Sequence, residues 1–156
     1  MLCDIDFEQL TTLSYPLANR FYKQAREKGK TQSSDEIYVA RIEQKIIAAV
    51  RLCPLSGSKV LSTQPSAKLL LRSLAVLPEY RRTGIGTQFM QYIAEQIGSR
   101  ECWCYPFSWL QEFYEQFGFH IVEPNDAPEF IRTPFGNYQR QGRDILIMAL
   151  NTRNKD

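Results

Sequence analysis

The sequence is poor in the residues that build metal sites and disulfide frameworks. It contains one histidine, His120, and four cysteines, Cys3, Cys53, Cys102 and Cys104, without a Cys-x-x-Cys pair. Zinc sites usually need such paired spacings, so we expect no metal ion. Cys102 and Cys104 are two residues apart in an expected strand, so their thiols point to one face. We interpret both as small buried apolar residues in a reducing compartment.

The chain also lacks a large excess of charge of one sign and a long apolar run. The formal net charge is +2, which indicates no surface for a nucleic acid or a membrane. No apolar run reaches the length of about 20 residues that a membrane-spanning helix needs. The first six residues are acidic and lack the basic and apolar regions of a signal peptide. We therefore expect a cytoplasmic protein with no nucleic-acid or membrane partner.

The length of 156 residues suits one domain with a sizeable core. The sequence shows no internal repeat, low-complexity tract or long linker. We expect residues 1–156 to form a single domain.

The first half of the chain predicts a helix followed by a β-hairpin. Ser14 and the proline two residues later favour a helix start, and Gly29 fits its stop. Two β-branched runs, Ile37–Ile42 and Lys45–Leu52, predict antiparallel strands, although the Glu-Gln pair between them lacks the usual turn glycine. The Ser- and Pro-rich stretch Pro54–Ser66 predicts a loop.

The second half alternates strands and helices. Lys68–Leu77 is almost wholly apolar, as a strand buried on both faces would be, and Pro78 ends it. Apolar residues then recur every four positions from Ile85 to Ile97, which predicts an amphipathic helix closed by Gly98. The remaining expected elements are a strand at 101–105, a helix from 106 to 117, a strand at 119–122, a long loop at 123–143 and a strand at 145–150. This order predicts an α/β or α+β domain with a mixed sheet covered by helices.

The segment from 81 to 87, here called the glycine loop, joins a buried strand to an amphipathic helix and is suited to an anion. Backbone N–H groups at a helix start have no intrahelical partner, and the helix dipole adds positive charge there. Gly84 and Gly86 allow a ligand to approach the backbone closely. The other residues of the loop are Arg81, Arg82, Thr83, Ile85 and Thr87. A tight turn with a satisfied helix cap is the alternative interpretation.

The loop does not fit the common nucleotide motifs. A Rossmann fingerprint needs a third glycine, and Phe89 stands in its place. A P-loop needs Gly-Lys-Ser/Thr after four spacers, and the sequence has none.

Two motifs together resemble the GCN5-related N-acetyltransferase (GNAT) family. The first is Arg81-x-x-Gly84-x-Gly86, which follows Leu-Ala-Val-Leu-Pro at 74–78. In the second, Tyr114 stands four residues before the pair Gly118-Phe119. The resemblance covers about residues 37–122 and the final strand. It implies an α/β (α+β) fold with a mixed, mostly antiparallel central sheet, helices on both faces and a splayed parallel strand pair.

The resemblance also implies a binding mode for acetyl-CoA, as a co-substrate, in a V-shaped cleft between the strands Lys68–Leu77 and Glu101–Tyr105. The backbone of Leu74, Ala75 and Val76 would pair with the pantetheine arm. The N–H groups from Arg82 to Thr87 would hold the pyrophosphate, with Arg81 beside them. Ser108 would touch the coenzyme, although a helix cap explains that serine equally well.

Tyr114 occupies the family position of the general acid that protonates the leaving thiolate, with a core aromatic as the alternative. The general base is not identified. Many relatives carry a glutamate on the strand before the loop, where this chain has only Arg72 and Ser73 as polar residues. Glu36, Glu101 or a water chain are candidates. Arg72 would either bind a substrate carboxylate or form a salt bridge at the strand end.

The acceptor is expected to be a small-molecule or peptide amine, and its class stays open among amino acids, polyamines, aminoglycosides and protein N-termini. The expected loop at 123–143 would help to enclose the acceptor, or its side chains would pack on the sheet; they include Phe130, Arg132, Phe135, Tyr138, Arg140 and Arg143. A homodimer is compatible with the sequence. The alternatives to an N-acetyltransferase are a non-catalytic acyl-CoA-binding or sensing domain on the same fold and an unrelated phosphate-ligand binder.

Overall fold

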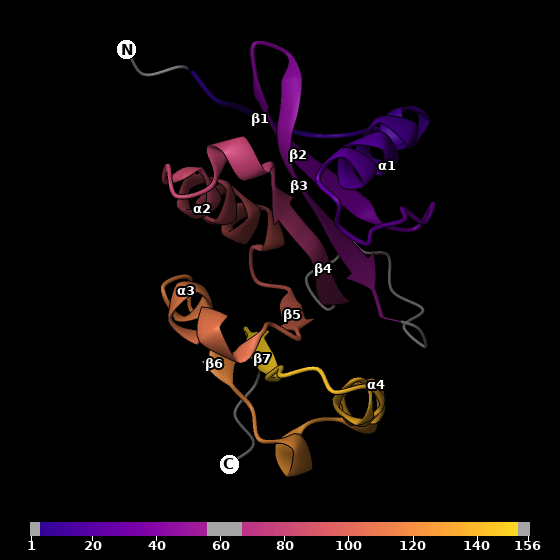
Figure 1. Ribbon diagram of the computed structural model, residues 1–156. Helices are drawn as coiled ribbons and strands as arrows, with labels where there is room; N and C mark the ends of the chain where they lie inside the picture. The colour runs from indigo at the N-terminus through magenta and orange to yellow at the C-terminus, as the bar shows by residue number, and fades with distance from the viewer. Residues whose placement is uncertain (1–3, 56–66, 153–156) are drawn as a thin grey trace. The chain divides into compact units, whose positions relative to one another are not determined.

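A computed structural model describes residues 4–55 and 67–152 (Figure 1). Cys3 and most of the expected loop Pro54–Ser66 lie outside the described residues. The strands form one mixed sheet in the order β1-β2-β3-β4-β5-β7-β6. Its β4–β5 pair is parallel, whereas the β1–β2, β2–β3, β5–β7 and β6–β7 pairs are antiparallel. The predicted mixed and mostly antiparallel sheet is therefore confirmed.

The bounds of the elements follow the chain. The strands are β1 Asp6–Gln9, β2 Glu36–Ile42, β3 Lys45–Pro54, β4 Lys68–Val76, β5 Glu101–Cys104, β6 His120–Ile121 and β7 Met148–Leu150. The α-helices are α1 Tyr15–Gln24, α2 Ile85–Ile97, α3 Gln111–Glu115 and α4 Glu129–Arg140. No helix in the described part of the chain is long and apolar enough to cross a membrane.

The chain divides into two compact units. The first comprises residues 1–54 and 71–96, and the second comprises residues 55–70 and 97–156. The strand β4 contributes its first three residues to the second unit and the rest to the first. The expectation of a single domain stays a prediction.

The first unit has a helix on each face of its strands. Tyr92 of α2 lies 5.0 Å from Phe7 of β1 and 5.8 Å from Tyr38 of β2, measured between ring centroids. Residues next to each other in a strand point to opposite faces, and residues two apart point to the same face. Phe7 pairs with Ala40, two residues from Tyr38, so both rings lie on the face that α2 covers. The other face is covered by α1, which packs on β3 and β2. Figure 1 shows α1 and α2 on opposite sides of these strands.

The hairpin between β2 and β3 forms as predicted, with an uncommon turn. Glu43 and Gln44 have φ values of 48° and 70°, so two residues other than glycine adopt the left-handed conformation. A two-residue turn with positive φ at both positions matches the twist of the flanking strands. A register shift between Ala40 and Arg41 then kinks β2 near this turn.

The strand β1 was not expected from the sequence. Its four residues carry a single aromatic, Phe7, so they show no period-2 pattern. Pairing with β2 and the ion pair between Glu8 and Arg41 hold the strand in place.

The helix α1 ends at Gln24, five positions before the glycine expected to stop it. Gly29 has another role, because the following loop packs on the ring of the fully buried Tyr22. A Cβ atom at position 29 would lie 2.7 Å from Tyr22 Cγ and Cδ2.

We expect Gly29→Ala to lower the free energy of unfolding by about 1–3 kcal/mol, because a buried aromatic ring cannot yield without disturbing its neighbours. Urea unfolding followed by circular dichroism measures the change. Gly86→Ala is the matched control, since an added Cβ there meets no atom within 4 Å. Equal stability of the two variants would contradict this packing.

The strand β4 differs from its sequence-based description, because only one of its two faces is fully buried. Leu69, Leu71 and Ala75 are buried, whereas Lys68 and Arg72 are exposed. Within it, Ser73 has a φ of 56°, a conformation that interrupts the regular pleat.

The second unit contains the largest departure from expectation. Residues 129–140 form the helix α4 instead of a loop, with Pro128 as N-cap and Pro134 inside. Ile131 and Phe135 are one turn apart and are buried in a cluster that contains Trp103. Their burial offsets the hydrogen bond that Pro134 cannot donate. The prolines and the glycine led to the wrong prediction of a loop.

Candidate active site

The glycine loop lies in the first unit and ends where α2 begins. Arg82 and Gly84 have positive φ values of 65° and 85°. The first main-chain hydrogen bond of α2 runs from Gln88 N–H to Gly84 O, at 3.1 Å. The N–H groups before Gln88 therefore have no acceptor in the helix ladder.

The surface of this loop is open. An added Cβ at Gly84 or Gly86 would meet no heavy atom within 4 Å. Gly84 needs glycine for its conformation, but Gly86 does not have a positive φ. The space beside Gly86 is therefore open without a conformational reason, as close approach of an anion to the backbone requires.

The arginines of the loop have different surroundings. Arg81 donates from Nε to Val76 O at 3.1 Å, and its Nη2 lies 3.6 Å from a carboxylate oxygen of Glu27. Arg81 thus ties the loop to the end of β4, and Arg82 is exposed. The Thr83 hydroxyl donates to Tyr80 O, and Ile85 and Thr87 are buried and half-buried. Coenzyme contacts by these side chains stay predictions.

The segment expected to pair with the pantetheine arm follows the parallel part of β4. The register between β4 and β5 runs from Lys68↔Glu101 to Leu70↔Trp103, within the second unit. Beyond it, Ala75 is buried, while Leu74 and Val76 are half-buried. Pairing of this backbone with a ligand stays a prediction.

Tyr114, the expected general acid, lies on α3 in the second unit and is 6% exposed. The rings of Phe113 and Phe119 contact it edge-on, with centroids 5.3 and 5.6 Å away. Burial raises the pKa of the Tyr114 phenol, and the nearby Cys104 and Cys102 thiols add to this effect. The phenol therefore keeps its proton at neutral pH, as a proton donor must.

Ser108, the other expected coenzyme contact in the second unit, is held by Asp144. Its hydroxyl donates to Asp144 Oδ2 at 2.7 Å, and its N–H donates to Asp144 O at 3.0 Å. The hydroxyl is therefore engaged with Asp144, and its expected contact with the coenzyme stays a prediction.

The two carboxylates considered as general bases are both engaged. Glu36 is buried and accepts a hydrogen bond from the Tyr38 hydroxyl at 2.7 Å. Glu101 accepts one from Trp103 Nε1 at 2.8 Å and lies 3.9 Å from Lys68 Nζ. The assignment of a base stays open.

The aromatic and arginine side chains of residues 129–143 pack largely within the second unit. Phe135 is buried, and Tyr138 packs edge-on against Tyr105. The Arg143 guanidinium lies 4.7 Å from the Tyr138 ring centroid. Two further arginines bond within the helix region, Arg132 to Ala127 O and Arg140 to Asn137. Phe130 is partly exposed, at 41%, with Lys68 above its ring.

The cysteines and the histidine do not gather into one cluster in the described residues. In residues 4–55 and 67–152, no group of three or more potential ligands is close enough to hold a metal ion. Cys53, Cys102 and Cys104 form no disulfide with one another, and the latter two are buried in β5 as expected. His120 is exposed, with Nε2 at 3.2 Å from the Thr152 hydroxyl.

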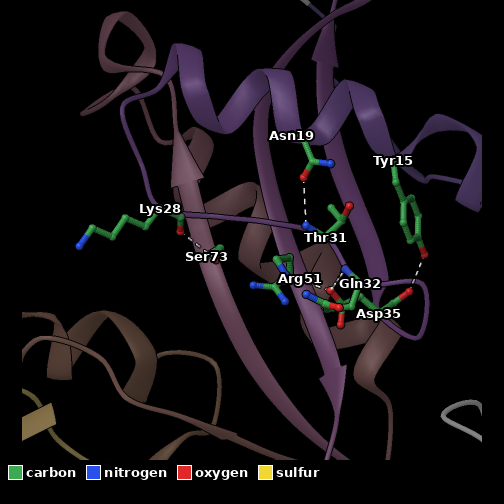
Figure 2. A network of polar contacts seen from close by, with 8 residues as sticks. All are labelled: Tyr15, Asn19, Lys28, Thr31, Gln32, Asp35, Arg51 and Ser73. Atoms are coloured by element: carbon green, nitrogen blue, oxygen red, sulfur yellow. Dashed lines mark hydrogen bonds and ion pairs between the residues drawn. The ribbon is translucent and has the colours of Figure 1, made fainter.

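Sequence reasoning missed a buried polar network in the first unit (Figure 2). Arg51 Nε donates to Asp35 Oδ2 at 2.9 Å, and both side chains are almost fully buried. Gln32 N–H donates to the same oxygen at 2.8 Å, and the Tyr15 hydroxyl donates to Asp35 O. The only available signal was an arginine inside the apolar run at 45–52.

Cys53 lies beside this network, and burial raises the pKa of its thiol to about 12 from 9.0. We expect its alkylation by iodoacetamide at pH 8 to be about 50-fold slower in the folded protein than in urea. The thiolate fraction falls by about 10³, and the higher nucleophilicity of a more basic thiolate offsets part of that loss. Mass spectrometry of the labelled peptide measures the rate, and equal rates with and without urea would contradict the prediction.

Comparison with known proteins gives the family. Residues 33–121 match the model of the acetyltransferase (GNAT) domain. No curated protein sequence matches the chain significantly.

Three solved structures illustrate the likeness of fold. The ribosomal-protein-S18-alanine N-acetyltransferase of Escherichia coli is 18% identical, with a TM-score of 0.64 and 98% of each chain covered. Arabidopsis thaliana Naa50, in complex with the bisubstrate analogue CoA-Ac-MVNAL, is 14% identical, with a TM-score of 0.62 and coverages of 93% and 97%. Neisseria gonorrhoeae N-acetylglutamate synthase, complexed with coenzyme A and N-acetyl-glutamate, is 14% identical, with a TM-score of 0.65 over 99% of this chain.

The present chain spans 36% of the length of that synthase. At these identities the structures show the fold alone, whereas the family model matches more than half of the sequence. The chain belongs to the GNAT acetyltransferase family.

Proposed function

We propose that the protein transfers an acetyl group from acetyl-CoA to the amine of an acceptor. The observation that carries this proposal is the open glycine loop at the start of α2, whose backbone at Gly86 is bare. Unpaired N–H groups at a helix N-terminus bind phosphate groups through hydrogen bonds and the helix dipole. Family membership supports the choice of coenzyme.

In the proposed complex, the N–H groups from Arg82 to Thr87 bind the pyrophosphate. The backbone of Leu74, Ala75 and Val76 pairs with the pantetheine arm, and Ser108 lies beside the coenzyme. Backbone N–H groups of β4 also polarise the thioester carbonyl.

The proposed reaction is a direct transfer. The neutral amine attacks the thioester carbon, so that a C–N bond forms and the C–S bond breaks. Tyr114 donates its phenolic proton to the leaving sulfur. The amine proton leaves to a base that we do not assign; Glu36, Glu101 and a water chain remain candidates.

The proposed acceptor is a small-molecule or peptide amine. Two of the similar structures contain molecules of this class, N-acetyl-glutamate in one and the bisubstrate analogue CoA-Ac-MVNAL in the other. We further propose a cytoplasmic location and no nucleic-acid, membrane or metal partner, with a homodimer as a compatible state.

Calorimetry with coenzyme A, followed by thiol release from acetyl-CoA across an amine panel, tests the proposal. We expect binding of coenzyme A in preference to ATP and NAD, and turnover with at least one amine. Tight binding without turnover on any amine would reject the enzyme and leave the non-catalytic binding domain. Binding of nucleotides but not of coenzyme A would reject both the enzyme and the non-catalytic acyl-CoA-binding domain.

A further inference from the structure

A buried hydroxyl without a partner lies on the α1 face of the first unit. The Tyr22 side chain is fully buried. Its hydroxyl is the one buried side-chain polar atom that lacks a hydrogen bond among the residues the structure describes. Such a group loses its hydrogen bonds to water when it is buried. This loss is unfavourable unless a ligand or a bound water supplies a new hydrogen bond.

The guanidinium of Arg51 lies near this hydroxyl and is only partly satisfied. Tyr15, two turns before Tyr22 on the same face of α1, donates its hydroxyl to Asp35 O, and Asp35 is the partner of Arg51. The positive charge of Arg51 also opposes the rise that burial causes in the pKa of Tyr22. Its Nε is bonded to Asp35, but its terminal nitrogens have no partner within residues 4–55 and 67–152. Figure 2 shows guanidinium nitrogens on the side of Arg51 that faces away from Asp35. The side chain is 8% exposed, and the Tyr22 hydroxyl is the one described side-chain polar atom that is both buried and unpaired, so the terminal nitrogens of Arg51 keep some contact with solvent.

A second guanidinium reaches the same region from the neighbouring strand. The bonds from Leu55 N–H to Lys68 O and from Leu77 N–H to Ile47 O show that β3 and β4 run antiparallel, and counting from these two pairs places residues 72–73 opposite Arg51. Arg72 and Arg51 both lower the pKa of the Cys53 thiol, against the larger effect of burial. The irregular backbone at Ser73, whose hydroxyl bonds Lys28 O at 3.2 Å, interrupts β4 next to Arg72. Arg72 is exposed and forms no ion pair with a described residue.

We propose that Tyr22, Arg51 and Arg72 bind the carboxylate of the acceptor, which is therefore an amine that carries a carboxylate. This inference rests on the proposed transferase function. A carboxylate has two acceptor oxygens in one plane, which match the forked donors of a guanidinium. The Tyr22 hydroxyl supplies a further donor to the same group.

The charge balance favours a monoanion over a phosphate. Asp35 neutralises one of the two guanidinium charges, and Glu27, the other carboxylate that acts on Tyr22, is paired with Arg81. A single positive charge is left for the ligand. A dianionic phosphate would bring an uncompensated negative charge into a largely buried site, which is costly.

The test uses butyrate as the probe and butyramide as its neutral isostere, with binding followed by ligand-observed NMR. We expect butyrate to bind at least 10-fold more tightly than butyramide. In the presence of acetyl-CoA, we expect at least 10-fold higher kcat/KM for 4-aminobutyrate than for butylamine, which presents the same amine without the carboxylate.

The variants Tyr22→Phe and Arg72→Gln should each weaken butyrate binding at least 10-fold. Tyr22→Phe should leave the melting temperature unchanged or raise it, because it removes an unpaired buried hydroxyl and keeps the ring. The matched controls are Tyr92→Phe, on the opposite face of the sheet, and Arg20→Gln, an exposed residue of α1.

Equal affinity for butyrate and butyramide, or unchanged butyrate affinity in both variants, would overturn the proposal and assign the cluster to a bound water. Coenzyme A binding is measured in parallel on the same samples. Coenzyme binding without butyrate binding would reject only this inference, whereas butyrate binding without coenzyme binding would reject the proposed function.

Discussion

Gly86→Glu is expected to abolish coenzyme A binding while it leaves the protein folded. The variant places a side chain and a negative charge on the bare backbone at the start of α2, where the pyrophosphate is proposed to lie. We expect the dissociation constant to rise at least 100-fold, which corresponds to a loss of about 2.7 kcal/mol. Calorimetry with coenzyme A measures this change.

Two features of position 86 separate a binding defect from a folding defect. Its φ is not positive, and an added Cβ meets no atom within 4 Å. A side chain at this position therefore has room without a change in the backbone. A glutamate in the first turn of a helix also favours the helix, through its dipole and by removal of a glycine, by about 0.3–1 kcal/mol from each effect. The melting temperature should therefore stay constant or rise while binding is lost.

Gln91→Glu is the matched control for charge. It adds the same negative charge to an exposed position farther along α2, where no ligand contact is proposed. We expect its coenzyme affinity to stay within about twofold of the original protein. Loss of affinity in both variants would assign the effect to overall charge, and retention in both would place the pyrophosphate elsewhere.

Tyr114→Phe is expected to lower kcat by about 10²-fold or more, with coenzyme affinity unchanged. General acid catalysis typically contributes 10²–10⁴-fold to a rate. The phenylalanine keeps the edge-on ring contacts with Phe113 and Phe119, so the helix α3 should retain its packing. Thiol release with a turned-over amine measures kcat, and calorimetry measures the affinity.

The pH profile gives a second readout of this tyrosine. Burial holds the pKa of the Tyr114 phenol above its ordinary value of 10.0, so the acid stays protonated at every pH below that value. We therefore expect no loss of kcat from this group below pH 10. Tyr138→Phe, in the same unit, serves as the control and should keep full turnover. Turnover of Tyr114→Phe equal to that of this control would exclude the acid role.

The elements that the sequence predicted well are those whose pattern is local. The helix α2 follows from apolar residues repeated every four positions and from Gly98, whose φ of 60° ends it as expected. The β2–β3 hairpin follows from two β-branched runs separated by a short polar pair. In each case the signal and the structure that it specifies lie within the same few residues.

The elements that the sequence missed depend on distant partners. The helix α4 contains Pro134 and Gly136, which argue against a helix, and burial of Ile131 and Phe135 beside Trp103 outweighs that local preference. The strand β1 has no periodic pattern and exists through its pairing with β2. Tertiary contacts decide such segments because local propensities amount to only tenths of a kcal/mol to a few kcal/mol.

The sequence by itself determined the family and the glycine loop. That loop consists of consecutive backbone groups, so the residues that define it are adjacent in the sequence. Only the tertiary structure decided which polar side chains form the proposed carboxylate site. Tyr22, Arg51 and Arg72 come from a helix and two strands, and no spacing in the sequence relates them. The unpaired Tyr22 hydroxyl exists only after α1 has packed on the sheet, since burial is what deprives this group of water.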